Sequence, residues 1–229
     1  MIRFVFGNDY GKYLLSEIRK KPLARDAEVL NIACEYDLVP SFMRREVNES
    51  QTYGIEINQD IVKTNSHIRY CDVNTDPFPF EDHRFDIVMS IFGIEHFQTP
   101  NVFQESYRVL KPGGRMMFIV PNGLYPMFLV NRLFGERFAR FYYRTIVKST
   151  YSPHKAYYRF NSIGAITKAS LDAGFESTDL TMYGPSNVLL YVKRSTLATK
   201  IVSGFDRLLT NTFLCRFKPY IIGVLERKE

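Results

Sequence analysis

The sequence predicts an α/β protein built on a doubly wound, mostly parallel sheet, and three observations support this. Apolar or β-branched runs alternate with helix-like segments over the first two thirds of the chain, which is the order that covers a parallel sheet on both faces. The 229 residues suffice for one sizeable domain with a full core and are short for two. The 45% hydrophobic and 24% charged fractions are typical of soluble globular proteins.

Each predicted strand is a short apolar or β-branched run between turn residues. The runs lie at roughly 27–33, 51–57, 67–71, 85–91 and 114–120, followed by a strand after Gly174 and a closing strand within 218–228. Helices are expected between them, at roughly 8–20, 38–48, 58–65, 99–110 and 160–173. The fourth helix should end at Lys111-Pro112-Gly113-Gly114, because Pro cannot continue a helix and Gly favours a turn.

The most informative stretch runs from Tyr70 to Asn122. It contains Cys71-Asp72-Val73, Asp76-Pro77-Phe78-Pro79-Phe80-Glu81-Asp82, Phe85-Asp86-Ile87-Val88, Glu95-His96-Phe97, Tyr107-Arg108-Val109-Leu110-Lys111-Pro112-Gly113-Gly114 and Pro121-Asn122. In order and spacing it resembles the second half of the cofactor domain of class I S-adenosylmethionine-dependent methyltransferases, and within them the Methyltransf_11 type. The resemblance implies a Rossmann-like sheet of seven strands, mostly parallel, with an antiparallel last strand, and S-adenosyl-L-methionine as cofactor.

The turn after the first strand departs from that family. The family has acid-x-Gly-x-Gly-x-Gly, because glycines let the backbone approach the methionine part of the cofactor. The same register here reads Asn31-Ile32-Ala33-Cys34-Glu35-Tyr36-Asp37. Ala33 adds one methyl group, whereas Glu35 and Asp37 add a Cβ where the turn can require positive φ, and a negative charge near the cofactor carboxylate. Glu35 could instead face the cofactor's ammonium group and replace the charge lost at Asn31. Alternatively, the turn has closed over an unused site.

The other implied cofactor residues follow the next strands. Glu56, about 20 residues past the first turn, occupies the position of an acid that accepts hydrogen bonds from the ribose hydroxyls. Asp72 should accept from the adenine amino group, with the N–H of Val73 at a ring nitrogen. The backbone of Ser90, Ile91 and Phe92 should lie beneath the sulfonium.

Methyl transfer needs alignment, exclusion of water and sometimes a base, so no metal is expected. His96 is the base candidate, because an imidazole titrates close to neutral pH. A structural role is favoured for the Glu95-His96 pair, which would orient the loop and cap the next helix. Tyr10 and Tyr13 could close over the methionine end, although ordinary packing is the favoured role.

Residues at about 123–158 are predicted to form an aromatic and basic cap inserted into a single domain, 1–229. Between 125 and 151 the chain has eight aromatic residues and five Lys/Arg against one acid. Its cations repeat on one helical face as Arg137, Arg140, Arg144 and Lys148, and Phe134, Phe138 and Phe141 follow another. A lid packed on the domain is one interpretation. The other is a peripheral membrane contact through residues 125–148, or a grip on an anionic, lipid-linked acceptor.

The combined features predict a methyltransferase acting on a small or lipid-linked acceptor, possibly a sugar hydroxyl in glycan or cell-surface polysaccharide synthesis. The alternative is an inactive pseudo-methyltransferase that serves as a binding or regulatory subunit. Nucleic acid is a disfavoured partner, because no stacking motif is present. Three widely spaced cysteines and the absence of a signal-peptide pattern favour a cytoplasmic protein, membrane-peripheral if the cap contacts lipid.

Overall fold

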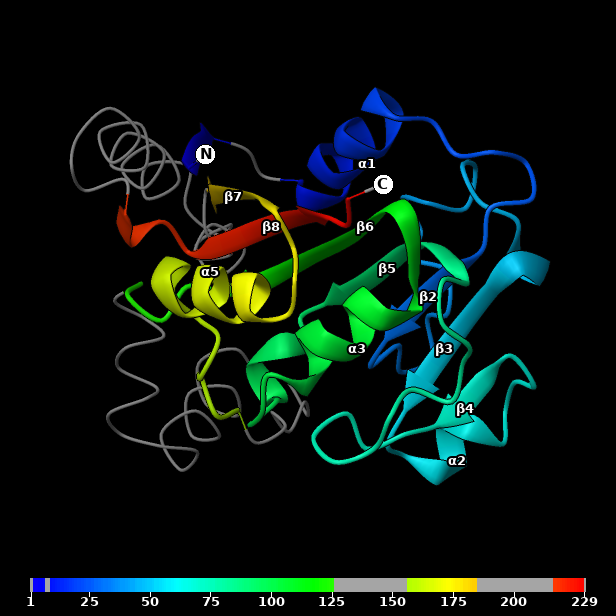
Figure 1. Cartoon of the computed structure of the whole chain (residues 1–229). Coiled ribbons are helices and arrows are strands. Elements are labelled where there is room, and N and C mark those ends of the chain that lie inside the picture. Colours follow the sequence, from blue (N-terminus) through cyan, green and yellow to red (C-terminus); the bar gives the residue numbers. More distant parts are fainter. Residues whose placement is uncertain (1, 7–8, 126–155, 185–215, 229) are drawn as a thin grey trace, which may run out of the picture.

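A single mixed sheet forms the centre of the molecule (Figure 1). The computed structural model describes residues 2–6, 9–125, 156–184 and 216–228. The strands of the sheet lie in the order β1-β7-β8-β6-β5-β2-β3-β4. Their bounds are β1 Ile2–Phe6, β2 Val29–Ile32, β3 Thr52–Glu56, β4 Ile68–Tyr70, β5 Phe85–Ile91, β6 Leu110–Pro121, β7 Ser177–Gly184 and β8 Tyr220–Glu226.

The predicted doubly wound sheet is confirmed. Strand β2 pairs in parallel with β3 on one side and β5 on the other, so the strand order reverses at β2. Strand β8 pairs antiparallel with both β6 and β7, which confirms the antiparallel closing strand. The sheet also carries β1 at one edge, parallel to β7, an eighth strand that the sequence analysis did not assign.

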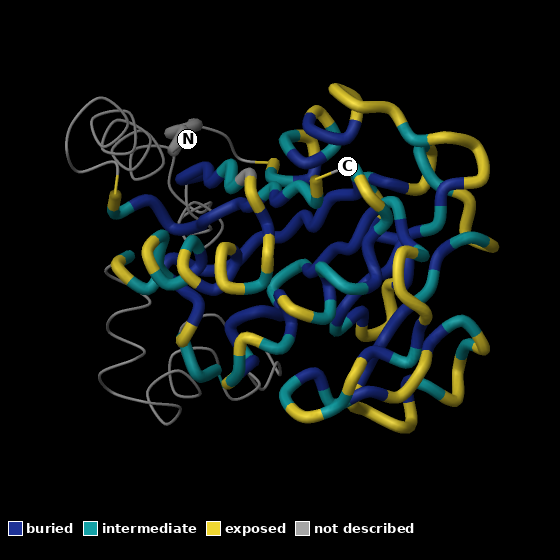
Figure 2. The backbone as a smooth tube through the Cα atoms, in the orientation of Figure 1, coloured by how far each residue is buried: buried dark blue, intermediate teal, exposed yellow. Residues whose placement is uncertain are grey.

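Helices cover both faces of the sheet (Figure 1). They are α1 Tyr10–Lys20, α2 Gln59–Val62, α3 Asn101–Val109 and α5 Ile163–Asp172. Alternate residues of a strand enter different cores: Leu30 and Val88 pack with α3 and α5, whereas Val29, Ile87 and Met89 pack with α1 and α2. Buried backbone therefore runs through the middle of the sheet, as Figure 2 shows.

The helix predicted at 38–48 is wrong, because residues 41–46 form successive turns. Two of the turn bonds run from Met43 N to the Pro40 carbonyl and from Glu46 N to the Met43 carbonyl, both at 2.8 Å. Pro40 disfavours helical backbone at the residue before it, which breaks the predicted helix near its start. The other four predicted helices are present with shifted ends, and 3-10 turns lie at Glu49–Gln51 (η1) and Ile94–His96 (η2).

Candidate functional site

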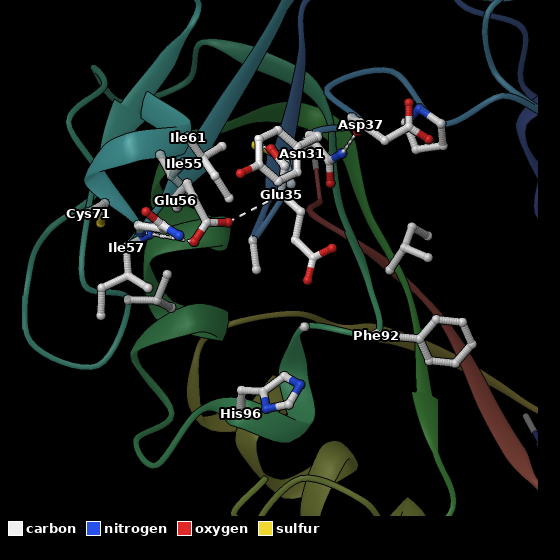
Figure 3. A pocket seen from close by; sticks show the side chains of 18 of the residues that line it. Asn31, Glu35, Asp37, Ile55, Glu56, Ile57, Ile61, Cys71, Phe92 and His96 are labelled. Atoms are coloured by element: carbon white, nitrogen blue, oxygen red, sulfur yellow. Dashed lines mark hydrogen bonds between the residues drawn. The ribbon is translucent and has the colours of Figure 1, made fainter. Parts of the chain in front are cut away.

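A cavity of about 1020 Å³ opens at the carboxyl ends of four neighbouring parallel strands, β2, β3, β4 and β5 (Figure 3). In open α/β sheets ligands bind at this edge, next to the point where the strand order reverses. The residues that line the cavity come from 31–44, 55–61, 71–74 and 91–97, together with Tyr10 of α1.

The structure brings nearly all of the predicted site residues together. The lining includes Asn31, Ala33, Glu35, Glu56, Asp72, Val73, Ile91 and His96. Ser90 is the exception: it is fully buried, and it lies outside the cavity lining. The next lining residues along the chain are Phe92, which was predicted together with Ser90 and Ile91, and Gly93, which was not predicted as a cofactor contact.

The turn after β2 keeps left-handed backbone without any glycine. Ala33 has φ of 53° and Glu35 has φ of 46°, whereas Asp37 is not left-handed. For a non-glycine residue this conformation costs about 1–2 kcal/mol. The strain expected from the sequence is therefore present at Glu35 and absent at Asp37. Ala33, which adds only one methyl group, is strained as well.

Asn31 holds the following segment in place. Its side-chain amide donates to the carbonyls of Asp37 at 3.1 Å and Leu38 at 3.2 Å. An acid at this position has no N–H to donate, so the amide has a structural purpose that the family's acid would lack. The Asn31 side-chain oxygen points away from these carbonyls, toward the cavity (Figure 3).

Glu56 connects the turn to the end of β3. Its Oε1 accepts from the backbone N–H groups of Ile57 at 2.9 Å and Asn58 at 3.1 Å. Its Oε2 accepts from the N–H of Glu35 at 3.1 Å. A carboxylate has about four lone-pair positions, so three amides leave Glu56 capacity for about one further donor.

Asp72 lines the cavity, and the described residues use only one of its two carboxylate oxygens. Its Oδ1 accepts from the backbone N of Asn74 at 3.0 Å and from that residue's side-chain nitrogen at 3.2 Å. The hydrogen bonds of the described residues leave its Oδ2 for a ligand. Val73 also lines the cavity, and its carbonyl accepts from Asn101, which ties this loop to the start of α3.

Gly93 forms a tight part of the cavity wall. A Cβ added there would lie 2.6 Å from Ser90 Oγ and 3.1 Å from the Ala33 Cβ. Only glycine leaves this space open. Ser90 Oγ is itself buried and has no hydrogen-bond partner among the described residues. Gly93 thus forms part of the cavity wall, and Ser90 lies behind it.

Aromatic side chains close one end of the cavity. The ring of Phe92 makes edge contacts with Tyr10 and with Tyr220, each at a centroid distance of 5.4 Å. Phe92 has φ of 56°, an outlier for an aromatic residue. Tyr10 lines the cavity, whereas the Tyr13 hydroxyl lies 2.9 Å from that of Thr181. The N-terminal helix therefore closes this end through Tyr10, and Tyr13 anchors it to β7.

The Glu95-His96 pair divides between core and cavity. Glu95 is 6% exposed, its Oε2 has no hydrogen-bond partner within the described part of the chain, and burial raises the pKa of its carboxyl to about 8. Its carbonyl accepts from the backbone N–H groups of Tyr157 and Tyr158, so it orients the returning chain. The predicted capping role is wrong, because the N-cap of α3 is Pro100 and no side chain caps it. His96 lines the cavity on the side opposite Glu56 (Figure 3).

The two described cysteines that border the cavity are not reactive thiols. Cys34 and Cys71 are buried and unpaired, and desolvation raises the pKa of each to about 12. A thiol with so high a pKa is scarcely ionised at neutral pH and is a weak nucleophile. Both line the cavity as small apolar groups.

Comparisons with known proteins agree with this geometry. Residues 30–118 match the family described as "Methyltransferase domain". The chain contains a class I S-adenosylmethionine-dependent methyltransferase domain. The matched residues include the turn after β2, Glu56, Asp72 and Gly93, and therefore nearly the whole cavity.

Curated relatives of the methyltransferase domain are distant. The ubiquinone/menaquinone biosynthesis C-methyltransferase of Idiomarina loihiensis is 29% identical over 107 residues, 42% of this chain and 43% of that protein. The enzyme of the same name from a Marinomonas species is 28% identical over 94 residues, 36% of this chain and 38% of that protein. The chain thus spans less than half the length of these relatives.

Solved structures share the fold over almost the whole chain. A methyltransferase from Archaeoglobus fulgidus has a TM-score of 0.56 at 14% identity and covers 95% of this chain and 94% of its own. Phosphoethanolamine N-methyltransferase 2 of Haemonchus contortus, in complex with S-adenosyl-L-methionine, has a TM-score of 0.54 at 15% identity, covering 96% of this chain and 53% of its own. At these identities the likeness establishes the fold.

The residues of the methyltransferase domain fit its cofactor. Gly93 lets the cavity wall pack closely against Ser90 and Ala33, where a Cβ would collide, and the described residues leave one carboxylate oxygen of Asp72 without a hydrogen bond. Glu56 can take about one ribose hydroxyl, fewer than the two that the sequence analysis expected.

Several predictions concern residues outside the described ranges. They are most of the cap at about 123–158, with its cationic and aromatic faces, and the membrane contact through 125–148. Among the helices that the structure describes, none is long and apolar enough to span a bilayer.

Proposed function

We propose that this protein is an S-adenosylmethionine-dependent methyltransferase that acts on a small or lipid-linked acceptor. One observation carries the proposal: the ends of β2 to β5 bring Glu56, Asp72 and Gly93 to a single cavity inside a methyltransferase domain. Ligand cavities of roughly 300–1,000 Å³ are usual for drug-sized molecules. At about 1020 Å³, this one has room for the cofactor and part of an acceptor.

The chain's own residues would position the reactants. Asp72 Oδ2 would accept from the adenine amino group, Glu56 would accept from one ribose hydroxyl, and Gly93 would keep the cavity wall closely packed against Ser90. When bound, the cofactor supplies an electrophilic methyl group on a sulfonium. Tyr10 and Phe92 would exclude water from this end of the cavity.

His96 remains the candidate base. It lies in the cavity, and an imidazole nitrogen could take the proton that the acceptor loses. Activity of His96→Gln against wild type would test this role, since a purely structural histidine would leave the pH dependence of turnover unchanged.

The class of acceptor is inferred from two observations. The named curated relatives are C-methyltransferases of quinone biosynthesis, and the lining of the cavity includes the aromatic pair Tyr10 and Phe92. Both observations favour an apolar or lipid-linked acceptor. A sugar hydroxyl stays a prediction from the sequence, which neither the relatives nor the described lining supports.

The rival proposal is a pseudo-methyltransferase, and the left-handed Ala33 and Glu35 are the observation that favours it. Strained backbone persists only where the surroundings hold it. Here Glu56 holds the turn through the N–H of Glu35, which can be a purely structural contact. The spare oxygen of Asp72 favours the enzyme, because the described fold makes no use of it.

Isothermal titration with S-adenosylmethionine and S-adenosylhomocysteine separates the two proposals. The test compares wild type, Asp72→Asn and the control Asp60→Asn, which removes a charge from an exposed residue outside the cavity lining. We expect micromolar binding by wild type and by the control, and at least tenfold weaker binding by Asp72→Asn. Folded wild type that binds neither ligand at millimolar concentration would overturn the enzyme proposal and favour the pseudoenzyme.

A further inference from the structure

Glu35 carries a carboxylate into the cavity from a position where the family has glycine. Its left-handed backbone, at φ of 46°, sets the direction of the side chain, and Glu35 lines the cavity. Figure 3 shows the carboxylate pointing into the cavity, between Glu56 on one side and His96 on the other. A glycine would leave the turn's backbone in place and remove this charge.

The described lining of the cavity is predominantly negative. It contains four carboxylates, those of Glu35, Asp37, Glu56 and Asp72, against one guanidinium, that of Arg44. Arg44 lies 3.3 Å from Asp37, and both side chains are more than half exposed, so solvent screens this pair. A cavity lined by one sign of charge raises the local concentration of ligands of the opposite sign.

S-adenosylmethionine and S-adenosylhomocysteine differ by one methyl group and one positive charge. Their nucleoside, ammonium and carboxylate groups are the same, so a carboxylate in the cavity distinguishes them mainly through the sulfonium. Transfer breaks the bond between methyl carbon and sulfur, and the electron pair stays on sulfur. The sulfur is then neutral, and its attraction to a nearby carboxylate ends.

We propose that Glu35 makes the site selective for the sulfonium form of the cofactor over the neutral thioether product. The inference rests on the proposed function and adds a residue that determines ligand specificity. At an effective dielectric constant near 20, one charge pair within the cavity changes a dissociation constant by about tenfold or more. Glu35 therefore favours both capture of the methyl donor and release of the spent cofactor.

The experiment measures the affinity of three ligands for three forms of the protein. The ligands are S-adenosylmethionine, S-adenosylhomocysteine and sinefungin, whose amine replaces the sulfonium with another cation. The proteins are wild type, Glu35→Gln, and Asp60→Asn as a matched loss of one exposed negative charge. Glu35→Gln keeps the side-chain length and the backbone N–H that Glu56 accepts.

We expect Glu35→Gln to lower the ratio of S-adenosylmethionine to S-adenosylhomocysteine affinity by about tenfold. The affinity of Glu35→Gln for sinefungin should fall in parallel with its affinity for S-adenosylmethionine. Asp60→Asn should keep the wild-type ratio of affinities. An unchanged ratio in Glu35→Gln would overturn the inference and leave the proposed function intact. Wild type that binds none of the three ligands would overturn the proposed function and the inference with it.

A second variant separates charge from bulk. Glu35→Gly removes both the carboxylate and the side chain that occupies the cavity. We expect its affinity ratio to equal that of Glu35→Gln, because the ratio depends on charge. If the affinity ratio stays at the wild-type value in Glu35→Gln and changes only in Glu35→Gly, the effect comes from the bulk of the side chain. This result would refute the electrostatic role.

Discussion

The backbone N–H of Glu35 donates a hydrogen bond of 3.1 Å to Oε2 of Glu56. This bond joins the turn after β2 to the end of β3 and thereby defines one wall of the cavity. It also gives Glu56 two tasks, supporting the turn and accepting from the cofactor. Loss of cofactor binding after a change at Glu56 would consequently be ambiguous.

Substitutions at Glu56 and Asp72 should separate these tasks. Glu56→Gln should lower the free energy of unfolding by about 1–3 kcal/mol, because three partly buried backbone amides lose a charged acceptor. Asp72→Asn keeps an oxygen for Asn74 and should cost less than about 1 kcal/mol. Urea unfolding of both variants measures the difference. Equal destabilisation would show that the Glu56 bonds do not support the turn.

Restoring the family's acid should harm this chain. Asn31→Asp removes two donors from the carbonyls of Asp37 and Leu38 and places a carboxylate beside them. We expect a loss of about 1–3 kcal/mol in the free energy of unfolding at neutral pH. Part of this loss should be recovered near pH 4, where the introduced acid protonates. Stability equal to wild type at pH 7 would contradict the structural role of the amide.

Glycine should stabilise the strained turn. Ala33→Gly removes a left-handed alanine and should raise the free energy of unfolding by up to about 1 kcal/mol. The matched control, Ala165→Gly inside α5, should lower it by about 0.5–1 kcal/mol. In thermal unfolding, the two variants should shift the melting temperature in opposite directions if the backbone at Ala33 is strained. They should shift it in the same direction if it is not.

Gly93 and Ser90 should behave as a coupled pair. Gly93→Ala places a Cβ 2.6 Å from Ser90 Oγ and should destabilise the fold by about 1–3 kcal/mol. Ser90→Ala alone should be nearly neutral, because the buried hydroxyl has no hydrogen-bond partner. The double variant should recover part of the loss, which a double-mutant cycle would measure. If the two single substitutions have additive effects on the free energy of unfolding, the added methyl group of Gly93→Ala does not collide with Ser90 Oγ.

Glu95 should make stability depend on pH. Because its pKa is raised from 4.5 to about 8 in the folded protein, its favourable contribution is complete below about pH 4.5 and is lost as the pH rises through about 8. Wild type should lose on the order of 1 kcal/mol per pH unit across this window, and Glu95→Gln should lose much less. Urea unfolding at pH 5.5 and 7.5, with the exposed Glu49→Gln as control, tests this. Parallel pH profiles for wild type and Glu95→Gln would exclude the buried acid as the cause.

The sequence predicted much of the site because strand ends are local features. Glu56 and Asp72 each follow a recognisable apolar run, and parallel strands bring such positions to one edge of a sheet. Gly93 was missed, although a glycine shortly after a buried strand is a usable signal for close ligand approach. Ser90 lies outside the cavity lining because successive side chains of a strand point to opposite faces of the sheet, and that of Ser90 points into the core.

The sequence by itself determined the fold class, seven of the eight strands along the chain and the residue types at the cofactor edge, because periodicity and turn chemistry are properties of neighbouring residues. The tertiary structure alone decided how those residues are used. Whether Glu35 tolerates left-handed backbone depends on Glu56, about twenty residues away in the chain and one hydrogen bond away in space. The burial that raises the pKa of Glu95 likewise comes from segments that meet only in the folded protein.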